Sequence, residues 1–121
     1  MAGITPAPIA SLPLFHKVAG TRIVVVGEGP MAEAKRRLVE RAGAVPCGEV
    51  EAHHAALAFV AVEDAAEAAA VRRRLKAKGL LVNVADKPDL CDFTTPSILD
   101  RDPLLIAIGT GGASAGLAKA L

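Results

Sequence analysis

The sequence contains no tryptophan and no tyrosine, and phenylalanine occurs only three times. The core must therefore be aliphatic, built from Val, Leu, Ile and Ala. Platforms that stack single-stranded nucleic acid need aromatic faces, and three phenylalanines supply few. The sequence also has no large excess of either charge, because 14 Lys plus Arg nearly balance 13 Asp plus Glu. A net charge of +1 gives no electrostatic reason to expect nucleic acid or an anionic membrane as partner.

Cysteines and long apolar runs are scarce as well. Cys47 and Cys91 form neither a disulfide framework nor a metal-ligand spacing, and a reduced, cytoplasmic setting fits them best. His53 and His54 are adjacent, so their side chains diverge and no metal site is expected. No apolar run approaches the roughly 18 residues that span a bilayer. Residues 1–11 are expected to be a loose leader without the features of a signal peptide.

The 121 residues, 52% hydrophobic and 22% charged, suffice for one ordered domain. The strongest signals are short, continuous apolar runs, which are typical of strands buried on both faces of a parallel sheet. These runs lie at residues 23–26, 44–47, 57–62, 80–84 and 104–108. Helical patterns separate them, and strands that alternate with helices indicate an α/β fold.

Two helices have recognisable ends. Pro30 suits a first helical position, and the apolar face of this helix is predicted to hold Met31, the Lys35 stem, Leu38 and Ala42, before Gly43 ends it. The second helix is predicted to run from Asp64, with Glu67 in capping-box spacing, to Gly79. Its buried face is predicted to hold Ala68, Val71 and Leu75. Its later part carries Arg72, Arg73, Arg74, Lys76 and Lys78, which we expect on a solvated face.

A glycine turn joins the first strand to the first helix. It reads Gly27-Glu28-Gly29-Pro30-Met31-Ala32, a G-x-G-x-x-A pattern between a strand and a helix. The first glycine permits a tight turn, the second lets a pyrophosphate approach the backbone, and the small Ala32 lets helix and strand pack closely. Free N–H groups at the helix start then face the phosphates. The turn predicts dinucleotide binding, although two glycines also suit an ordinary tight turn.

An acidic residue about 20 positions after such a turn is expected to meet the adenosine ribose. Glu49 has that spacing from Gly29, and an acid there favours NAD over NADP. An ordinary exposed loop glutamate is an equally good interpretation.

The connection after the second strand is short. Nine residues, 48–56, separate it from the next run. Extended, they span roughly 30 Å, enough for a loop or one helical turn but not for another strand and helix. We therefore predict a Rossmann-like, mainly parallel sheet of about five strands in the order 2-1-3-4-5, shortened after the second strand.

Further motifs follow along the chain. They are Leu12-Pro13-Leu14-Phe15, Ala32-Glu33-Ala34-Lys35, Val82-Asn83-Val84-Ala85-Asp86, Pro96-Ser97-Ile98-Leu99-Asp100-Arg101 with Pro103-Leu104, and Gly109-Thr110-Gly111-Gly112-Ala113-Ser114. Together with the glycine turn they resemble the precorrin-2 dehydrogenase/sirohydrochlorin ferrochelatase domain of siroheme synthase. The resemblance covers residues 12–121, with a gap between the second strand and the next.

The resemblance implies oxidation of precorrin-2 to sirohydrochlorin with NAD, and some members of the family also insert ferrous iron. It places the family's key aspartate on Asp86. Ligands of open α/β sheets bind beyond the carboxyl ends of the strands, and a carboxylate there can accept a proton from the substrate. The competing interpretation of Asp86 is a turn-forming aspartate before Lys87-Pro88.

Two further groups of residues are candidates. Asn83 is expected either to hold the nicotinamide region or to terminate its strand. The loop of Thr110, Gly111 and Gly112 is expected to offer backbone N–H groups to substrate carboxylates, although a plain glycine loop fits equally well.

The resemblance also bears on domain organisation. It makes residues 12–113 an NAD-binding domain and residues 114–121 the start of a helix leading into a helical dimerisation region, with which the protein is expected to be a homodimer. A non-catalytic NAD-binding module, structural or regulatory, is the alternative function. The sequence leaves open the iron step, the NAD or NADP preference and whether the chain is a fragment.

Overall fold

The computed structural model describes residues 6–109. They belong to two compact units, one formed by residues 17–95 and one formed by residues 6–16 with 96–109. The first unit holds the parallel sheet and both helices. The second holds a two-stranded sheet and the segment that precedes the first unit.

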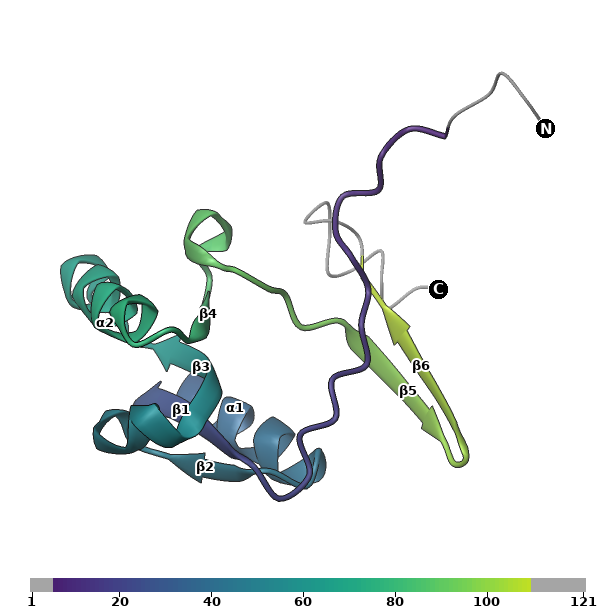
Figure 1. Cartoon of the computed structure of the whole chain (residues 1–121), viewed down its shortest axis with the longest axis horizontal. Helices are drawn as coiled ribbons and strands as arrows, with labels where there is room; N and C mark the ends of the chain where they lie inside the picture. Colours follow the sequence, from purple (N-terminus) through teal and green to yellow (C-terminus); the bar gives the residue numbers. More distant parts are fainter. Residues whose placement is uncertain (1–5, 110–121) are drawn as a thin grey trace. The chain divides into compact units, whose positions relative to one another are not determined.

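The parallel sheet of the first unit has four strands. They are β1 (Arg22–Gly27), β2 (Val45–Cys47), β3 (Ala55–Ala61) and β4 (Leu81–Val84), in the order β2-β1-β3-β4 (Figure 1). Every neighbouring pair is parallel, with Val24 opposite Cys47 and Val25 opposite Phe59. The predicted Rossmann-like α/β class and the order 2-1-3-4 are confirmed.

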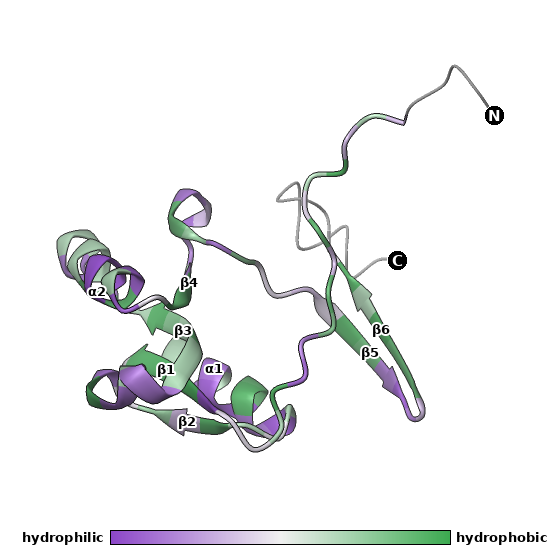
Figure 2. Ribbon diagram, in the orientation of Figure 1, coloured by the Kyte–Doolittle hydropathy of each residue, from purple (hydrophilic) through white to green (hydrophobic). Residues whose placement is uncertain are grey.

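The two faces of this sheet carry separate apolar clusters. Ile23 and Val25 point to the face covered by α1 (Pro30–Arg41), where they pack with Val39 and Phe59. Val24 points to the opposite face and packs with Val71 and Leu75 of α2 (Ala65–Ala77). Helices on both faces explain why β1 is a continuous apolar run. Figure 2 shows β1 and β3 in the green of apolar residues, while both helices carry purple, hydrophilic residues.

The helix ends follow the predicted signals. Asp64 caps α2, because its carboxylate accepts a hydrogen bond of 2.9 Å from the Glu67 N–H. Gly43 and Gly79 follow the two helices with φ angles of 84° and 89°. The predicted buried residues Ala68, Val71 and Leu75 are confirmed for α2.

The predicted buried face of α1 is wrong at its two ends but right at Leu38, which packs partly buried against the cluster of Ile23 and Val25. Ala32 and Val39, two turns apart, are buried, whereas Met31 is 43% exposed and Ala42 is exposed. The physical reason is the close approach of helix and strand. Only the small side chain of Ala32 fits at the point of contact, so the buried stripe is centred on that residue rather than on its larger neighbours.

The short connection from β2 to β3 is a stretch of 3₁₀ helix, η1 (Glu49–His54), six residues long. It has about two turns rather than the predicted loop or single turn, and it contains no further strand, as predicted. Its Ala52 is 1% exposed and belongs to the cluster beneath α2. The crossover therefore passes over β1 on the face opposite α1.

The predicted fifth strand does not join the parallel sheet. Residues 104–108 form β6 (Leu104–Ile108), which pairs antiparallel with β5 (Ser97–Arg101) in a separate sheet. Two residues join these strands, and so short a connection permits only an antiparallel hairpin. An apolar run alone does not distinguish this arrangement from a buried parallel strand. Several of its apolar side chains are exposed, among them Leu104 at 58% and Leu105 at 48%.

No helix among residues 6–109 is long and apolar enough to cross a membrane. The predicted helix at 114–121 lies outside the described residues.

Candidate functional site

Four connections leave the carboxyl edge of the parallel sheet. Residues 28–29 follow β1, Gly48 follows β2, residues 62–64 follow β3, and residues 85–87 follow β4. Because all four strands are parallel, these connections meet at one edge. The chain passes from β1 to α1 on one face and from β3 to α2 on the other. The boundary between β1 and β3 is thus the switch point at which open α/β sheets bind ligands.

Gly27 ends β1 in a place that no side chain could occupy. Its φ is 130°, and a Cβ on it would lie 2.0 Å from the carbonyl oxygen of Ala61. The first glycine of the turn is therefore required by the close approach of β3 as well as by the turn itself.

Gly29 has the opposite surroundings. Its φ is 94°, and a Cβ there would meet nothing within 4 Å, so the backbone is open on this side. Pro30 begins α1 at its first position, and Ala32 is fully buried. The first N–H groups of a helix have no acceptor within the helix, so Met31 and Ala32 provide backbone donors next to an open glycine. This arrangement fits the pyrophosphate of a dinucleotide.

Arg36 holds the same turn from within α1. Its Nη2 donates a hydrogen bond of 2.8 Å to the Gly27 carbonyl oxygen, and its Nη1 pairs with the Glu33 carboxylate. No pattern in the sequence points to Arg36. A basic residue nine positions after the first glycine carries no signal until the turn brings the two together.

Asp86 lies in a tight turn directly after β4. The Lys87 N–H donates to the Val84 carbonyl at 3.2 Å, and the Ala85 N–H donates to the Val60 carbonyl at 2.9 Å. Asp86 has a φ of 60°, which aspartate tolerates better than most residues. The turn-forming role is therefore present. The side chain is exposed, and within residues 6–109 its carboxylate has no hydrogen-bond or ion-pair partner, so it remains available to a ligand.

Cys91 holds this turn in place through hydrogen bonds of its sulfur atom. Its sulfur accepts a hydrogen bond from the Val84 N–H at 3.2 Å, and its thiol has the carbonyls of Val84 and Lys87 as acceptors at 3.1 and 3.4 Å. The contacts link both ends of the turn that carries Asp86. No pattern in the sequence indicates this role for Cys91.

The segment after the turn lies along the edge of β4 that has no neighbouring strand within residues 6–109. There Asp92 supplies hydrogen-bond partners for backbone groups of the strand. Asp92 accepts from the Val82 N–H at 2.8 Å and from Lys76 at 2.9 Å, and its own N–H donates to the Val82 carbonyl at 2.7 Å. Partial desolvation raises the pKa of Asp92, but the hydrogen bonds from Lys76 and Val82 outweigh it and hold this pKa below its usual range.

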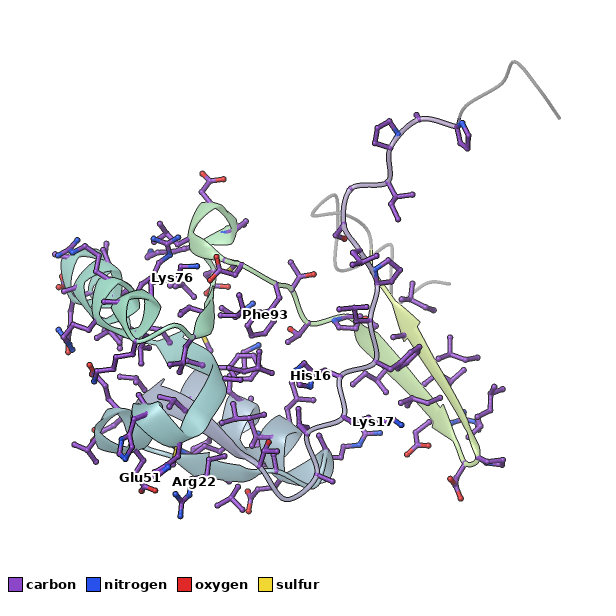
Figure 3. All side chains as sticks on the ribbon, viewed as in Figure 1. His16, Lys17, Arg22, Glu51, Lys76 and Phe93 are labelled. Atoms are coloured by element: carbon purple, nitrogen blue, oxygen red, sulfur yellow. The ribbon has the colours of Figure 1, made fainter. Side chains whose placement is uncertain are left out.

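Asn83 anchors the same segment. It is 7% exposed, and its Nδ2 donates to the Phe93 carbonyl at 2.8 Å. The Phe93 ring meets Phe59 edge-on, with 5.6 Å between centroids, and Figure 3 labels it. Asn83 lies within β4, which continues through Val84, so it anchors the following segment rather than terminating the strand, and contact with a nicotinamide stays a prediction.

Glu49 is paired with a residue far along the chain. Both of its carboxylate oxygens accept hydrogen bonds from Arg74, at 2.7 and 2.9 Å. These bonds lower the pKa of Glu49 against the effect of partial burial. Each oxygen of a carboxylate has a second acceptor position, so Glu49 could still accept from a ribose hydroxyl. That contact stays a prediction. The negative charge of Glu49 is already compensated by Arg74.

The basic end of α2 is more structured than a solvated face. Besides the Arg74–Glu49 and Lys76–Asp92 pairs, Arg72 donates a hydrogen bond of 2.8 Å to the Leu90 carbonyl. These three side chains fasten η1 and the segment after β4 to the helix.

No metal site forms in the part of the chain that the structure describes. The rings of His53 and His54 lie 3.8 Å apart between centroids and are tilted by 46°, so the prediction that these adjacent side chains diverge is wrong. No group of three or more His, Cys, Asp or Glu side chains within residues 6–109 could hold an ion. Burial and the charge of Glu51 raise the pKa of the Cys47 thiol, although Arg22 opposes them. Arg22 and Glu51, both labelled in Figure 3, form an ion pair with 3.4 Å between Nε and Oε2.

The carboxyl edge therefore carries Gly27 at the end of β1 and Asp86 after β4, and Asn83 lies within β4. Gly29 follows β1, and Pro30, Met31 and Ala32 begin α1 there. Glu49 lies in the crossover, paired to α2. Thr110, Gly111 and Gly112 lie outside the described residues.

Comparisons with known proteins agree with this geometry. A family model described as "putative NAD(P)-binding" matches residues 46–97, which begin after the glycine turn. The solved structure of SirC, precorrin-2 dehydrogenase, has a TM-score of 0.67 and 22% identity, and the match covers 91% of this chain and 67% of that one. Fold and site together define a Rossmann-like nucleotide-binding domain.

Two curated relatives are more similar to this chain in sequence. The siroheme synthase of Methylobacillus flagellatus is 36% identical over 137 positions, covering 92% of this chain and 29% of the relative. The siroheme synthase of Pseudomonas entomophila is 37% identical, covering 89% of this chain and 29% of the relative. The chain is thus similar to these siroheme synthases over most of its own length, and it spans less than a third of theirs. An alignment longer than the 121 residues of this chain requires gaps in it, in keeping with the predicted shortening.

Proposed function

We propose that this chain is an NAD-dependent precorrin-2 dehydrogenase domain that oxidises precorrin-2 to sirohydrochlorin. The observation that carries the proposal is the placement of the glycine turn and Asp86 at one edge of the sheet, one strand apart on either side of β3. Two strand spacings, about 10 Å, separate the ends of β1 and β4. A cofactor held at the first and a substrate held at the second would lie next to each other. The names of the related proteins support the choice of substrate.

The turn after β1 would hold the pyrophosphate. Gly29 leaves the backbone open, and the N–H groups of Met31 and Ala32 would donate to phosphate oxygens. Pro30 fixes the start of the helix without adding a donor. Glu49 would accept from the ribose, and Asn83 would flank the nicotinamide end. NAD, when bound there, supplies a hydride acceptor.

Asp86 would act as the base. Oxidation of precorrin-2 removes two electrons and two hydrogens, one as hydride and one as a proton. The Asp86 carboxylate, exposed and without a partner in residues 6–109, is in position to accept the proton. The turn between Val84 and Lys87 fixes where that carboxylate lies.

The proposal extends to the remaining partners. Thr110, Gly111 and Gly112 would meet substrate carboxylates, and Asp86 would also take protons from pyrrole nitrogens if ferrous iron is inserted as a second substrate. A homodimer would form where a helical region follows the domain. Two free thiols suit a reduced cytoplasm.

Anaerobic incubation with precorrin-2 and NAD, with sirohydrochlorin followed by absorbance, tests the proposal. It is run on this chain and on one extended past Leu121 if the gene continues. NAD binding is measured alongside by calorimetry. Sirohydrochlorin formation with one NADH per product supports the dehydrogenase. NAD binding without product from either chain would instead support the non-catalytic NAD-binding module. Ferrous iron added to the product, followed as siroheme, tests the iron step separately.

A further inference from the structure

The glycine turn contains one peptide group whose orientation is fixed by a side chain. Arg36, in the second turn of α1, donates through Nη2 to the Gly27 carbonyl oxygen at 2.8 Å. Its Nη1 pairs with Glu33, one helical turn earlier. Arg36 is therefore bound to both sides of the junction between strand and helix, and its side chain is 30% exposed.

This contact determines the direction of a neighbouring donor. In a trans peptide the carbonyl and the following N–H point in opposite directions. Holding the Gly27 carbonyl toward Arg36 thus turns the Glu28 N–H away from the body of α1. The residue after Glu28, Gly29, is open, because a Cβ there would meet nothing within 4 Å.

Because the turn contains two glycines, it needs a contact such as that of Arg36 to fix its backbone. Gly27 and Gly29 both have positive φ, and glycine adopts many backbone conformations at little cost. A turn with two glycines loses considerable conformational entropy when it is fixed around a ligand. A side chain that fixes the turn beforehand reduces that loss, and so strengthens binding without touching the ligand.

Arg36 is poorly placed to act as a charge on the phosphates. Its two terminal nitrogens already bond to Gly27 and Glu33, and the Glu33 carboxylate compensates its charge. Its effect on a ligand would pass through the peptide that it holds.

We propose that Arg36 is a positioning residue for the pyrophosphate of NAD, holding the Gly27–Glu28 peptide in its binding orientation. The inference rests on NAD binding in the proposed function. The ligand chemistry concerned is a dinucleotide or a nucleoside diphosphate, both of which carry the pyrophosphate, and not a nucleoside without phosphate.

Calorimetric titration with NAD, ADP-ribose and adenosine tests the proposal on Arg36→Met, Arg36→Lys and the matched control Arg37→Met. Arg37 is exposed on the same helix, so its replacement changes the net charge equally. We expect Arg36→Met to weaken NAD and ADP-ribose about tenfold, the equivalent of one charge-assisted hydrogen bond. Adenosine binding should not change. Arg36→Lys, which can still reach one carbonyl, should recover part of the loss, and Arg37→Met should bind as the wild type does.

Three results would overturn the inference. NAD affinity of Arg36→Met within twofold of the wild type would show that the contact does not assist binding. Equal losses for NAD and adenosine would show a general structural effect. Full recovery in Arg36→Lys together with a loss in Arg37→Met would show a charge effect. If Arg36→Met does not fold, Arg36→Lys carries the comparison. Absence of NAD binding to the wild type would overturn the proposed function itself, which keeps the two failures distinct.

Discussion

Gly27 and Ala61 approach so closely that a methyl group on Gly27 would lie 2.0 Å from the Ala61 carbonyl oxygen. The contact joins the ends of β1 and β3, the two strands between which the ligand site is expected. It also makes one glycine of the turn a requirement of the fold, while Gly29 is free of such contacts.

Gly27→Ala is therefore expected to destabilise the protein strongly. A positive φ costs a non-glycine residue about 1–3 kcal/mol, and the clash with backbone atoms of Ala61 adds to it. Urea unfolding measures the loss. Gly20→Ala is the matched control, because Gly20 also has positive φ (78°) but an open environment. Equal losses for the two variants would show that the contact with Ala61 is unimportant.

Cys91→Ala is expected to lower the free energy of unfolding by about 1–2 kcal/mol, because the Val84 N–H loses its acceptor. Cys91→Ser, which retains a donor and an acceptor, should lose less. Denaturant titration checks both. If Ala and Ser variants were as stable as the wild type, the thiol would not support the turn that carries Asp86.

Stability is expected to fall in acid through Asp92 and Glu49. Both have pKa values that the fold lowers, so each binds its proton more weakly in the folded than in the unfolded state. Their contribution is present above the unfolded pKa of about 4. It is lost as the pH falls through the lower folded values. Unfolding measured between pH 7 and pH 3 should show this decline, and Asp92→Asn should show a shallower one from a lower starting stability. An unchanged slope in Asp92→Asn would contradict the assignment.

Glu49→Gln tests the predicted ribose contact. If the carboxylate accepts from the ribose, the variant should bind NAD about tenfold more weakly, the value of a hydrogen bond to a charged group, and discriminate less against NADP. Arg74→Met is the control, because it removes the partner of Glu49 but leaves the acid. NAD and NADP affinities that stay at wild-type values in Glu49→Gln would remove this residue from the site.

The local signals in the sequence predicted most of the first unit. The helix ends were predictable because the residues that mark them affect only the backbone next to them in the sequence. These residues are Asp64, Gly43 and Gly79. The nine residues of the crossover limited its path to one short helix. The glycine turn lies where its pattern predicted, between β1 and α1.

The features that were missed depend on partners distant in the sequence. Residues 104–108 pair with β5 rather than β4, and an apolar run does not specify its neighbour. The contacts of Arg36 with Gly27 and of Arg74 with Glu49 arise only when the fold brings those residues together. Cys91 likewise supports the turn only because the fold brings its sulfur next to the Val84 N–H.

The rate of sirohydrochlorin formation by Asp86→Asn tests the central claim most directly. Asparagine tolerates the same positive φ, so the turn should persist without a carboxylate. Under anaerobic conditions with saturating NAD, we predict a loss of at least about 100-fold, the usual contribution of a general base. NAD affinity should not change, and the nearby Asp89→Asn should retain full activity. Wild-type turnover by Asp86→Asn would contradict the assignment of Asp86 as the base.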